Sequence, residues 1–221
     1  MITSKDVFLY YPNLLGYGRI ILGILSFMTM RHCPLTTAIL YGTSGFLDAL
    51  DGHLARTYNQ SSRFGAMLDQ LTDRCTFMAL LICLSVFYPS FTFIFQMIAI
   101  IDIASHWLHL HATDLTGKNT HKSSDNPILN LYYTSKPVLF FMCLGNEAFF
   151  GLLYLLNFYT GPTLLSISLL KVITVLMFPV AAVKIGISII HLITASQTIT
   201  EFDANNANKL ISNNDVNKKG H

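Results

Sequence analysis

Long stretches of this chain carry almost no charge. Residues 75–101 include no charged side chain, and residues 137–170 include only Glu147. Each stretch is longer than the roughly 20 apolar residues that a helix needs to cross a bilayer. The 221-residue chain is 52% hydrophobic and only 12% charged, with a mean hydropathy of +0.49. The sequence therefore predicts an all-α integral membrane protein, a bundle of about six transmembrane helices preceded by a short N-terminal interfacial segment.

Prolines and polar segments divide the apolar sequence into the expected spans. We expect spans at residues 13–30, from 35 to a polar segment at 57–63, and then at 64–87, 91–109, 136–157 and 163–194. Residues 1–204 would then form a single transmembrane domain. Residues 205–221 are rich in asparagine and lysine and are predicted to form a disordered cytosolic tail.

Four aspartates stand in two pairs within this apolar context. Asp48 and Asp51 are three residues apart and Asp69 and Asp73 are four apart, so each pair lies on one face of a helix. The polar residues 57–63 between the pairs are typical of a turn that joins two antiparallel helices. We therefore expect the two pairs to meet at the same depth and to form one site.

Four carboxylates so close together need positive charge nearby. Two like charges about 4 Å apart repel by roughly 4 kcal/mol at an effective dielectric constant near 20. Oxygen ligands without cysteine favour Mg²⁺ or Mn²⁺ over zinc, and the number of carboxylates suggests two ions. Gly52 and Ala55 leave room on the same helix face, and Arg56 offers a forked donor suited to phosphate. The pattern indicates metal-assisted displacement at a phosphate.

Other interpretations of the charged residues stay open. Surface carboxylates paired with arginines are the simplest, but ionisable groups within a membrane are costly and usually functional. Carboxylates at membrane depth are also typical of cation transporters. Arg19, the only charge in the first span, either extends to the membrane surface or faces the acidic site. Asp102, His106 and His109 share a helix face, which fits a zinc site, a polar wall of a hydrated pocket, or histidines at the membrane boundary.

Basic residues are distributed unevenly between the expected loops. If the N-terminus is cytosolic, Arg31 stands alone on the opposite side, and the cytosolic segments hold Lys5, Arg56, Arg63, Lys118, Lys122, Lys136, Lys209, Lys218 and Lys219. This asymmetry predicts that both termini and the four carboxylates are cytosolic. The last four residues, Lys-Lys-Gly-His, match a dilysine signal for retrieval to the endoplasmic reticulum membrane.

Charge and cysteine content exclude several function classes. A net charge of +2 and a sequence pI near 8.3 do not indicate a nucleic-acid partner. The four cysteines show no CxxC spacing and are expected to be small core residues. Residues 1–11 lack the features of a cleaved signal peptide, so the first span should stay in the protein.

The spacing of the acidic residues resembles a known signature. The pattern Asp-x2-Asp-Gly-x2-Ala-Arg-x8-Gly-x3-Asp-x3-Asp runs from Asp48 to Asp73 and is similar to that of the CDP-alcohol phosphatidyltransferases. The resemblance implies that Asp48, Asp51, Asp69 and Asp73 hold the metal ions, and that Asp73 is also the general base. It further implies that Gly52, Arg56 and Ser62 contact the nucleotide diphosphate, with Ala55 and Gly65 completing the motif. Asn13 and Arg19 match the family's entry to its first helix, in which Gly16 replaces a common threonine.

Further segments resemble the eukaryotic phosphatidylinositol synthases within that family. They are residues 12–17, 63–69, 71–75, 104–111 with His106, 132–137 with Lys136, and 191–195. The resemblance implies that CDP-diacylglycerol donates a phosphatidyl group to myo-inositol and that CMP leaves. Glycerol 3-phosphate, serine and choline remain alternative acceptors, and a cation transporter is the alternative outside the enzymes. Association of two copies as a homodimer is left open.

Overall fold

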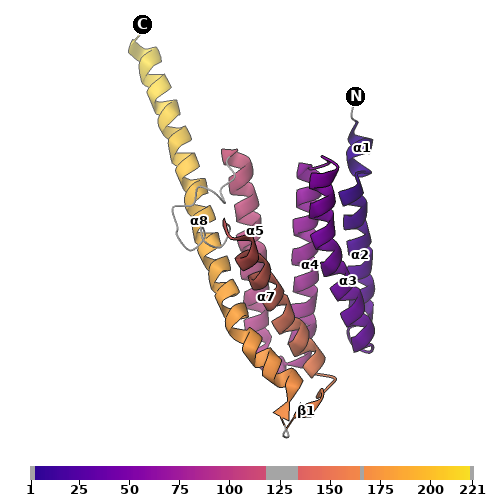
Figure 1. Ribbon diagram of the computed structural model, residues 1–221. Helices are drawn as coiled ribbons and strands as arrows, with labels where there is room; N and C mark the ends of the chain where they lie inside the picture. Colours follow the sequence, from indigo (N-terminus) through magenta and orange to yellow (C-terminus); the bar gives the residue numbers. More distant parts are fainter. Residues whose placement is uncertain (1–2, 118–133, 165–166, 220–221) are drawn as a thin grey trace. The chain divides into compact units, whose positions relative to one another are not determined.

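The computed structural model describes residues 3–117, 134–164 and 167–219, and these are almost entirely helical (Figure 1). The elements are α1 (Ser4–Phe8), α2 (Tyr11–Thr29), α3 (Pro34–Thr57), α4 (Arg63–Phe87), the 3-10 turn η1 (Pro89–Phe91), α5 (Thr92–Thr116), α7 (Lys136–Leu156), the short strands β1 (Thr163–Leu164) and β2 (Ile167–Ser168), and α8 (Leu169–Lys219). The predicted all-α class is confirmed.

Four helical segments are long and apolar enough to cross a membrane. They are Arg63–Phe87, Pro89–Thr116, Pro137–Leu156 and Leu169–Ile211. Large apolar side chains on the surface fit this assignment, since Met28 is 74% exposed, Phe93 72% and Val175 69%. Helices α2 and α3 occupy the first two predicted spans, and their crossing of the membrane stays a prediction.

Element boundaries differ from the predicted spans near the C-terminus. Helix α5 continues to Thr116, beyond the predicted end at residue 109. The last span was expected from residue 163, but β1 and β2 form an antiparallel hairpin there and α8 begins only at Leu169. The preceding turn contains Gly161 with φ +70°, a conformation that glycine adopts without steric cost.

The segment predicted as a disordered tail is helical in the structure. Helix α8 extends to Lys219, whereas the sequence predicts disorder from residue 205. Residues 203–211 are exposed, so the helix has no packed face there. No proline or glycine lies between Gly186 and Gly220, so no residue of this stretch forces the helix to end.

The chain forms two compact units, and the acidic motif lies in the first, made of residues 1–99 and 147–177. Within it α2 packs against α3 and α4 (Figure 1). Glycines allow the close approach to α4, because a Cβ added at Gly16 would lie 2.9 Å from Leu68 Cδ2, and one added at Gly23 would lie 3.2 Å from Thr76 Cγ2.

The C-terminal part of α7 is held in the same unit by aromatic residues. The ring of Phe150 packs edge-on against Phe77 of α4, with ring centroids 5.1 Å apart. The Tyr154 hydroxyl donates a hydrogen bond of 2.8 Å to the Met30 carbonyl at the end of α2. Both residues are almost fully buried, so α7 has a fixed register against α4 from Glu147 onward.

The second unit consists of residues 100–146 and 178–221. Its apolar core includes Ile187 of α8 packed against Leu139 and Met142 of α7. Gly145 is essential to this packing, because an added Cβ would lie 2.5 Å from Val180 Cγ1. The unit also contains the predicted polar residues Asp102 and His106.

Candidate active site

A short turn brings the two aspartate pairs together. Helix α3 ends at Thr57 and α4 begins at Arg63, with Asn59 in the left-handed region at φ 52°. Ser62 caps α4, since its hydroxyl accepts a 3.0 Å hydrogen bond from the Gly65 amide. The antiparallel helices then place Asp48 and Asp51 opposite Asp69 and Asp73, as the sequence predicts.

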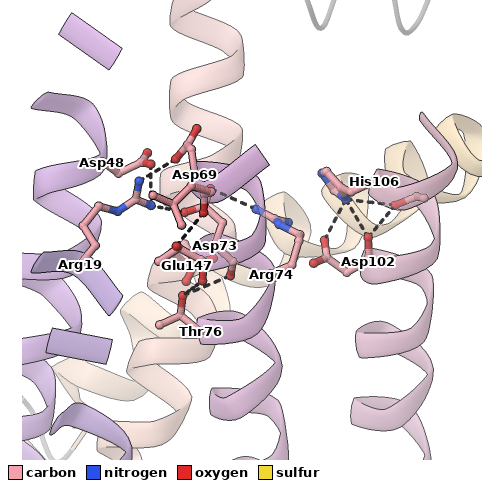
Figure 2. Close-up of polar contacts among 12 residues, drawn as sticks. Arg19, Asp48, Asp69, Asp73, Arg74, Thr76, Asp102, His106 and Glu147 are labelled. Atoms are coloured by element: carbon pink, nitrogen blue, oxygen red, sulfur yellow. Dashed lines mark hydrogen bonds and ion pairs between the residues drawn. The ribbon is translucent and has the colours of Figure 1, made fainter. Parts of the chain in front are cut away.

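All four carboxylates contact the guanidinium group of Arg19 on α2, and Figure 2 shows three of them, Asp48, Asp69 and Asp73, around it. The Nη2 atom lies 2.7 Å from Asp48 Oδ1 and 2.5 Å from Asp73 Oδ1. The Nη1 atom lies 2.6 Å from both Asp51 Oδ2 and Asp69 Oδ1. The four aspartates therefore form one site, and we call them the aspartate cluster.

Arg19 is an integral part of this site. It is only 1% exposed, so the alternative in which it extends to the membrane surface is wrong. An arginine buried this deeply needs paired charges, and the aspartate cluster supplies them. Arg74 adds a second positive charge, with its Nη2 3.5 Å from Asp73 Oδ2. Four ionised carboxylates against these two guanidinium groups leave a formal surplus of two negative charges, which favours the binding of further cations.

The donor atoms of the cluster fit a hard divalent cation. Asp48, Asp51 and Asp69 each offer a carboxylate oxygen, and these oxygens lie within 4.8 Å of one another. Carboxylate-only donors suit magnesium and manganese. Arg19 contacts one oxygen of each of these carboxylates, and each carboxylate has a second oxygen that can bind an ion. The positive charges of the guanidinium and of a bound ion repel, so the two compete for the negative charge of the cluster.

A pocket of about 200 Å³ lies beside the cluster on the side of the α3–α4 turn. Its lining includes most of the predicted phosphate-binding and motif residues, namely Asn13, Asp51, Gly52, Ala55, Arg56, Ser62, Gly65 and Asp69. The Arg56 guanidinium lies over the backbone of Gly52, with Nη1 3.6 Å from the position of an added Cβ. A phosphate in this pocket would find a forked cationic donor next to carboxylates that can hold a metal ion.

Asn13 fixes the floor of the pocket. It is 1% exposed, and its Nδ2 donates a 2.6 Å hydrogen bond to the Val7 carbonyl in α1. Its Oδ1 would lie 2.6 Å from a Cβ added at Gly65. Gly65 therefore has to be a glycine for α4 to come this close to α2.

The predicted Asp102 and His106 lie in the second unit. The His106 Nδ1 atom is 3.6 Å from Asp102 Oδ1 and 2.7 Å from the Asp102 carbonyl oxygen. His191 of α8 joins this group, with its ring centroid 4.1 Å from that of His109. Among the described residues the only side chains grouped to hold a metal ion are aspartates of the cluster, so the zinc interpretation gains no support.

Two contacts between distant segments have no counterpart in the prediction, and some predicted residues lie outside the described part of the chain. The position of His191 beside His109 has no signal in local sequence, because α5 and α8 are far apart along the chain. Glu147 is visible only as a lone charge in an apolar stretch. Lys118 and Lys122 fall outside the described residues, and so does the side chain of Lys136.

Membrane-spanning helices with a carboxylate cluster beside a pocket lined by Arg56 fit a phosphotransfer protein of the bilayer. A family model described as CDP-alcohol phosphatidyltransferase matches residues 9–155. The chain belongs to the CDP-alcohol phosphatidyltransferase family. This membership confirms an enzyme of phospholipid biosynthesis and disfavours the cation-transporter alternative.

Similar curated proteins cover nearly the whole chain. A mouse protein named CDP-diacylglycerol--inositol 3-phosphatidyltransferase is 50% identical over 204 residues, which is 91% of this chain and 96% of the mouse protein. The protein of the same name from Saccharomyces cerevisiae is 40% identical over 94% of each chain. An Arabidopsis thaliana protein, numbered 1 under that name, is 36% identical over 90% of this chain and 89% of its own. No solved structure gives a significant match.

Proposed function

We propose that this enzyme transfers the phosphatidyl group of CDP-diacylglycerol to myo-inositol, giving phosphatidylinositol and CMP. The observation that carries the proposal is the pocket beside the aspartate cluster, which combines Arg56 with Gly52 and Ser62. The printed name of relatives up to 50% identical supports inositol as the acceptor over glycerol 3-phosphate, serine and choline.

The residues of the pocket would bind the donor. Arg56 would pair with the diphosphate, and the missing side chain of Gly52 would let the diphosphate approach the α3 backbone. Asp48, Asp51, Asp69 and Asp73 would hold two ions of Mg²⁺ or Mn²⁺. When bound, such ions neutralise charge on the diphosphate and on the leaving CMP.

The carboxylate of Asp73 would act as the general base. An inositol hydroxyl oxygen attacks the phosphorus of the phosphatidyl group, and the bond from that phosphorus to the CMP oxygen breaks. The hydroxyl proton passes to Asp73, and CMP leaves with the bonding electron pair. Arg74, whose Nη2 lies 3.5 Å from Asp73 Oδ2, places a positive charge beside the base.

The distribution of basic residues supports an active site on the cytosolic face of the endoplasmic reticulum membrane. CDP-diacylglycerol would enter from the bilayer and inositol from the cytosol. The turn between α3 and α4 carries Arg56 and Arg63 at its two ends, as expected for a cytosolic loop.

Acceptor competition tests the proposal. The purified protein is given CDP-diacylglycerol and Mg²⁺ with either myo-inositol, glycerol 3-phosphate, serine or choline, and CMP release is measured. We expect release with inositol only. Release with another acceptor and none with inositol would contradict the assignment while leaving the reaction class intact.

A further inference from the structure

Glu147 is a second acidic feature of the first unit, outside the aspartate cluster. It is the only charged residue in residues 137–170 and lies within the apolar helix α7. Its Oε2 atom accepts a 2.8 Å hydrogen bond from the hydroxyl of Tyr41 on α3. An ionisable group inside a membrane span is costly and usually serves a function. The motif assigns no role to either residue.

The Tyr41–Glu147 pair lies close to the proposed base. The charges of Asp73, Arg74 and Glu147 all act on the Tyr41 hydroxyl, and Figure 2 shows Glu147 next to Asp73 and Arg74. Asp73 has two distinct sides, because its Oδ1 contacts Arg19 while its Oδ2 faces Arg74. The pair therefore lies beside the proposed base.

The donor pocket lies elsewhere around the cluster. Its lining includes Asp51 and Asp69 but contains none of Tyr41, Asp73 and Glu147. A two-substrate transfer needs the acceptor hydroxyl to reach both the base and the phosphorus. If the donor fills the pocket, the acceptor has to approach Asp73 from outside it, and the Tyr41–Glu147 pair supplies polar groups there.

We propose that Glu147 binds hydroxyl groups of the polyol acceptor beside Asp73, with Tyr41 as the residue that positions the Glu147 carboxylate. This inference rests on the proposed function and names part of its acceptor site. Inositol is a neutral ring of hydroxyl groups, so every contact with it is a hydrogen bond. A carboxylate has two oxygens and can accept more than one hydrogen bond, as the binding of a polyol requires. A carboxylate also binds hydroxyl donors more strongly than a neutral group does.

The test separates the two substrates kinetically. Glu147→Gln keeps the shape of the side chain and removes the charge, so the KM for myo-inositol should rise about 10-fold or more. The KM for CDP-diacylglycerol and its binding in the presence of Mg²⁺ should change less than twofold. Tyr41→Phe should raise the KM for inositol less. The double variant should add little to Glu147→Gln, because Tyr41 acts through Glu147.

A control variant and a second variant at the pair distinguish a binding role of Glu147 from a structural one. Glu201→Gln makes the same change at an exposed position of α8 and should leave both KM values unchanged. A Glu147→Gln protein with normal KM values and only a lower melting temperature would overturn the inference and assign Glu147 a structural role. If Glu147→Gln fails to fold, an unchanged inositol KM in Tyr41→Phe would overturn it instead. A wild-type enzyme that does not use inositol would refute the proposed function itself, so the two failures are distinguishable.

Discussion

At the scale of single residues, the four aspartates of the cluster have different surroundings. The side chain of Asp51 is 10% exposed, whereas those of Asp48 and Asp69 are 39% and 44% exposed. Asp73 alone contacts both Arg19 and Arg74. These differences lead us to expect distinct effects when each carboxylate is removed.

Asp73→Asn should separate catalysis from donor binding. The amide keeps the shape of the side chain and one potential metal-ligating oxygen, but it cannot accept the inositol proton. We expect CMP release to fall about 10²- to 10⁴-fold, while CDP-diacylglycerol binding in Mg²⁺ weakens much less. Asp51→Asn should instead reduce binding and turnover together. Near wild-type turnover in Asp73→Asn would refute its role as the base.

Arg19→Met should make the protein more dependent on metal ions. Without the guanidinium, the carboxylates repel one another in metal-free buffer, so the melting temperature in chelator should fall. The loss should be smaller than the about 3–5 kcal/mol typical of a broken buried pair, because three of the carboxylates are partly exposed. The rise in melting temperature on adding Mg²⁺ should be larger than in wild type. Arg31→Met, at an exposed position, is the control, and an equal rise in both variants would contradict the competition between Arg19 and metal.

At the scale of helices, glycines set the distance between α2 and α4. Gly16 and Gly23 face Leu68 and Thr76, and Gly65 faces Asn13 from the α4 side. A Cβ added at Gly16 or Gly23 would meet a side-chain atom of Leu68 or Thr76, and these atoms can shift. A Cβ added at Gly65 would instead meet the buried side chain of Asn13. The Asn13 side chain can move little, because its amide donates a hydrogen bond to the Val7 carbonyl.

Gly65→Ala and Gly18→Ala should therefore differ in their effects on stability. An added Cβ at Gly65 would lie 2.6 Å from Asn13 Oδ1, so we expect a loss of about 1–3 kcal/mol and weaker CDP-diacylglycerol binding. A Cβ at Gly18 meets nothing within 4 Å, and alanine there should leave stability unchanged or raise it by up to about 1 kcal/mol. Melting temperature and donor binding measured on both variants provide the check, and similar behaviour would contradict the close-contact argument.

Local sequence patterns predict the helices and the aspartate cluster well. They predict contacts between distant segments poorly. The spacing of Asp48 to Asp73 is enough to place the aspartate cluster, because helix periodicity and one turn determine it. The orientation of Arg19 is not determined in this way, since it depends on how α2 rotates against α3. The Tyr41–Glu147 bond joins residues 106 positions apart, and no periodicity predicts it. The hairpin of β1 and β2 was missed because its apolar residues resemble the start of a span.

At the scale of the whole molecule, the charge surplus of the cluster should make activity depend on divalent cations. We expect no CMP release in excess chelator and recovery on adding Mg²⁺ or Mn²⁺, because the four carboxylates need more positive charge than Arg19 supplies. Calcium, which prefers more ligands and longer bonds, should restore less activity. Full activity in excess chelator would rule out a metal site in the cluster.

The proposed orientation can be tested at the two ends of α3. Asn59-Gln60-Ser61 is a glycosylation sequon in the turn that we place in the cytosol, so Asn59 should carry no glycan in cells.

A glycan can also be missing for lack of access, so thiol labelling supplies the stronger evidence. In sealed microsomes with their cytosolic face outward, Ser61→Cys should react with a membrane-impermeant maleimide. The native Cys33, exposed before the start of α3, should react only after detergent is added. Labelling of Cys33 but not of residue 61 in sealed vesicles would invert the topology and place the aspartate cluster on the lumenal side, away from cytosolic inositol.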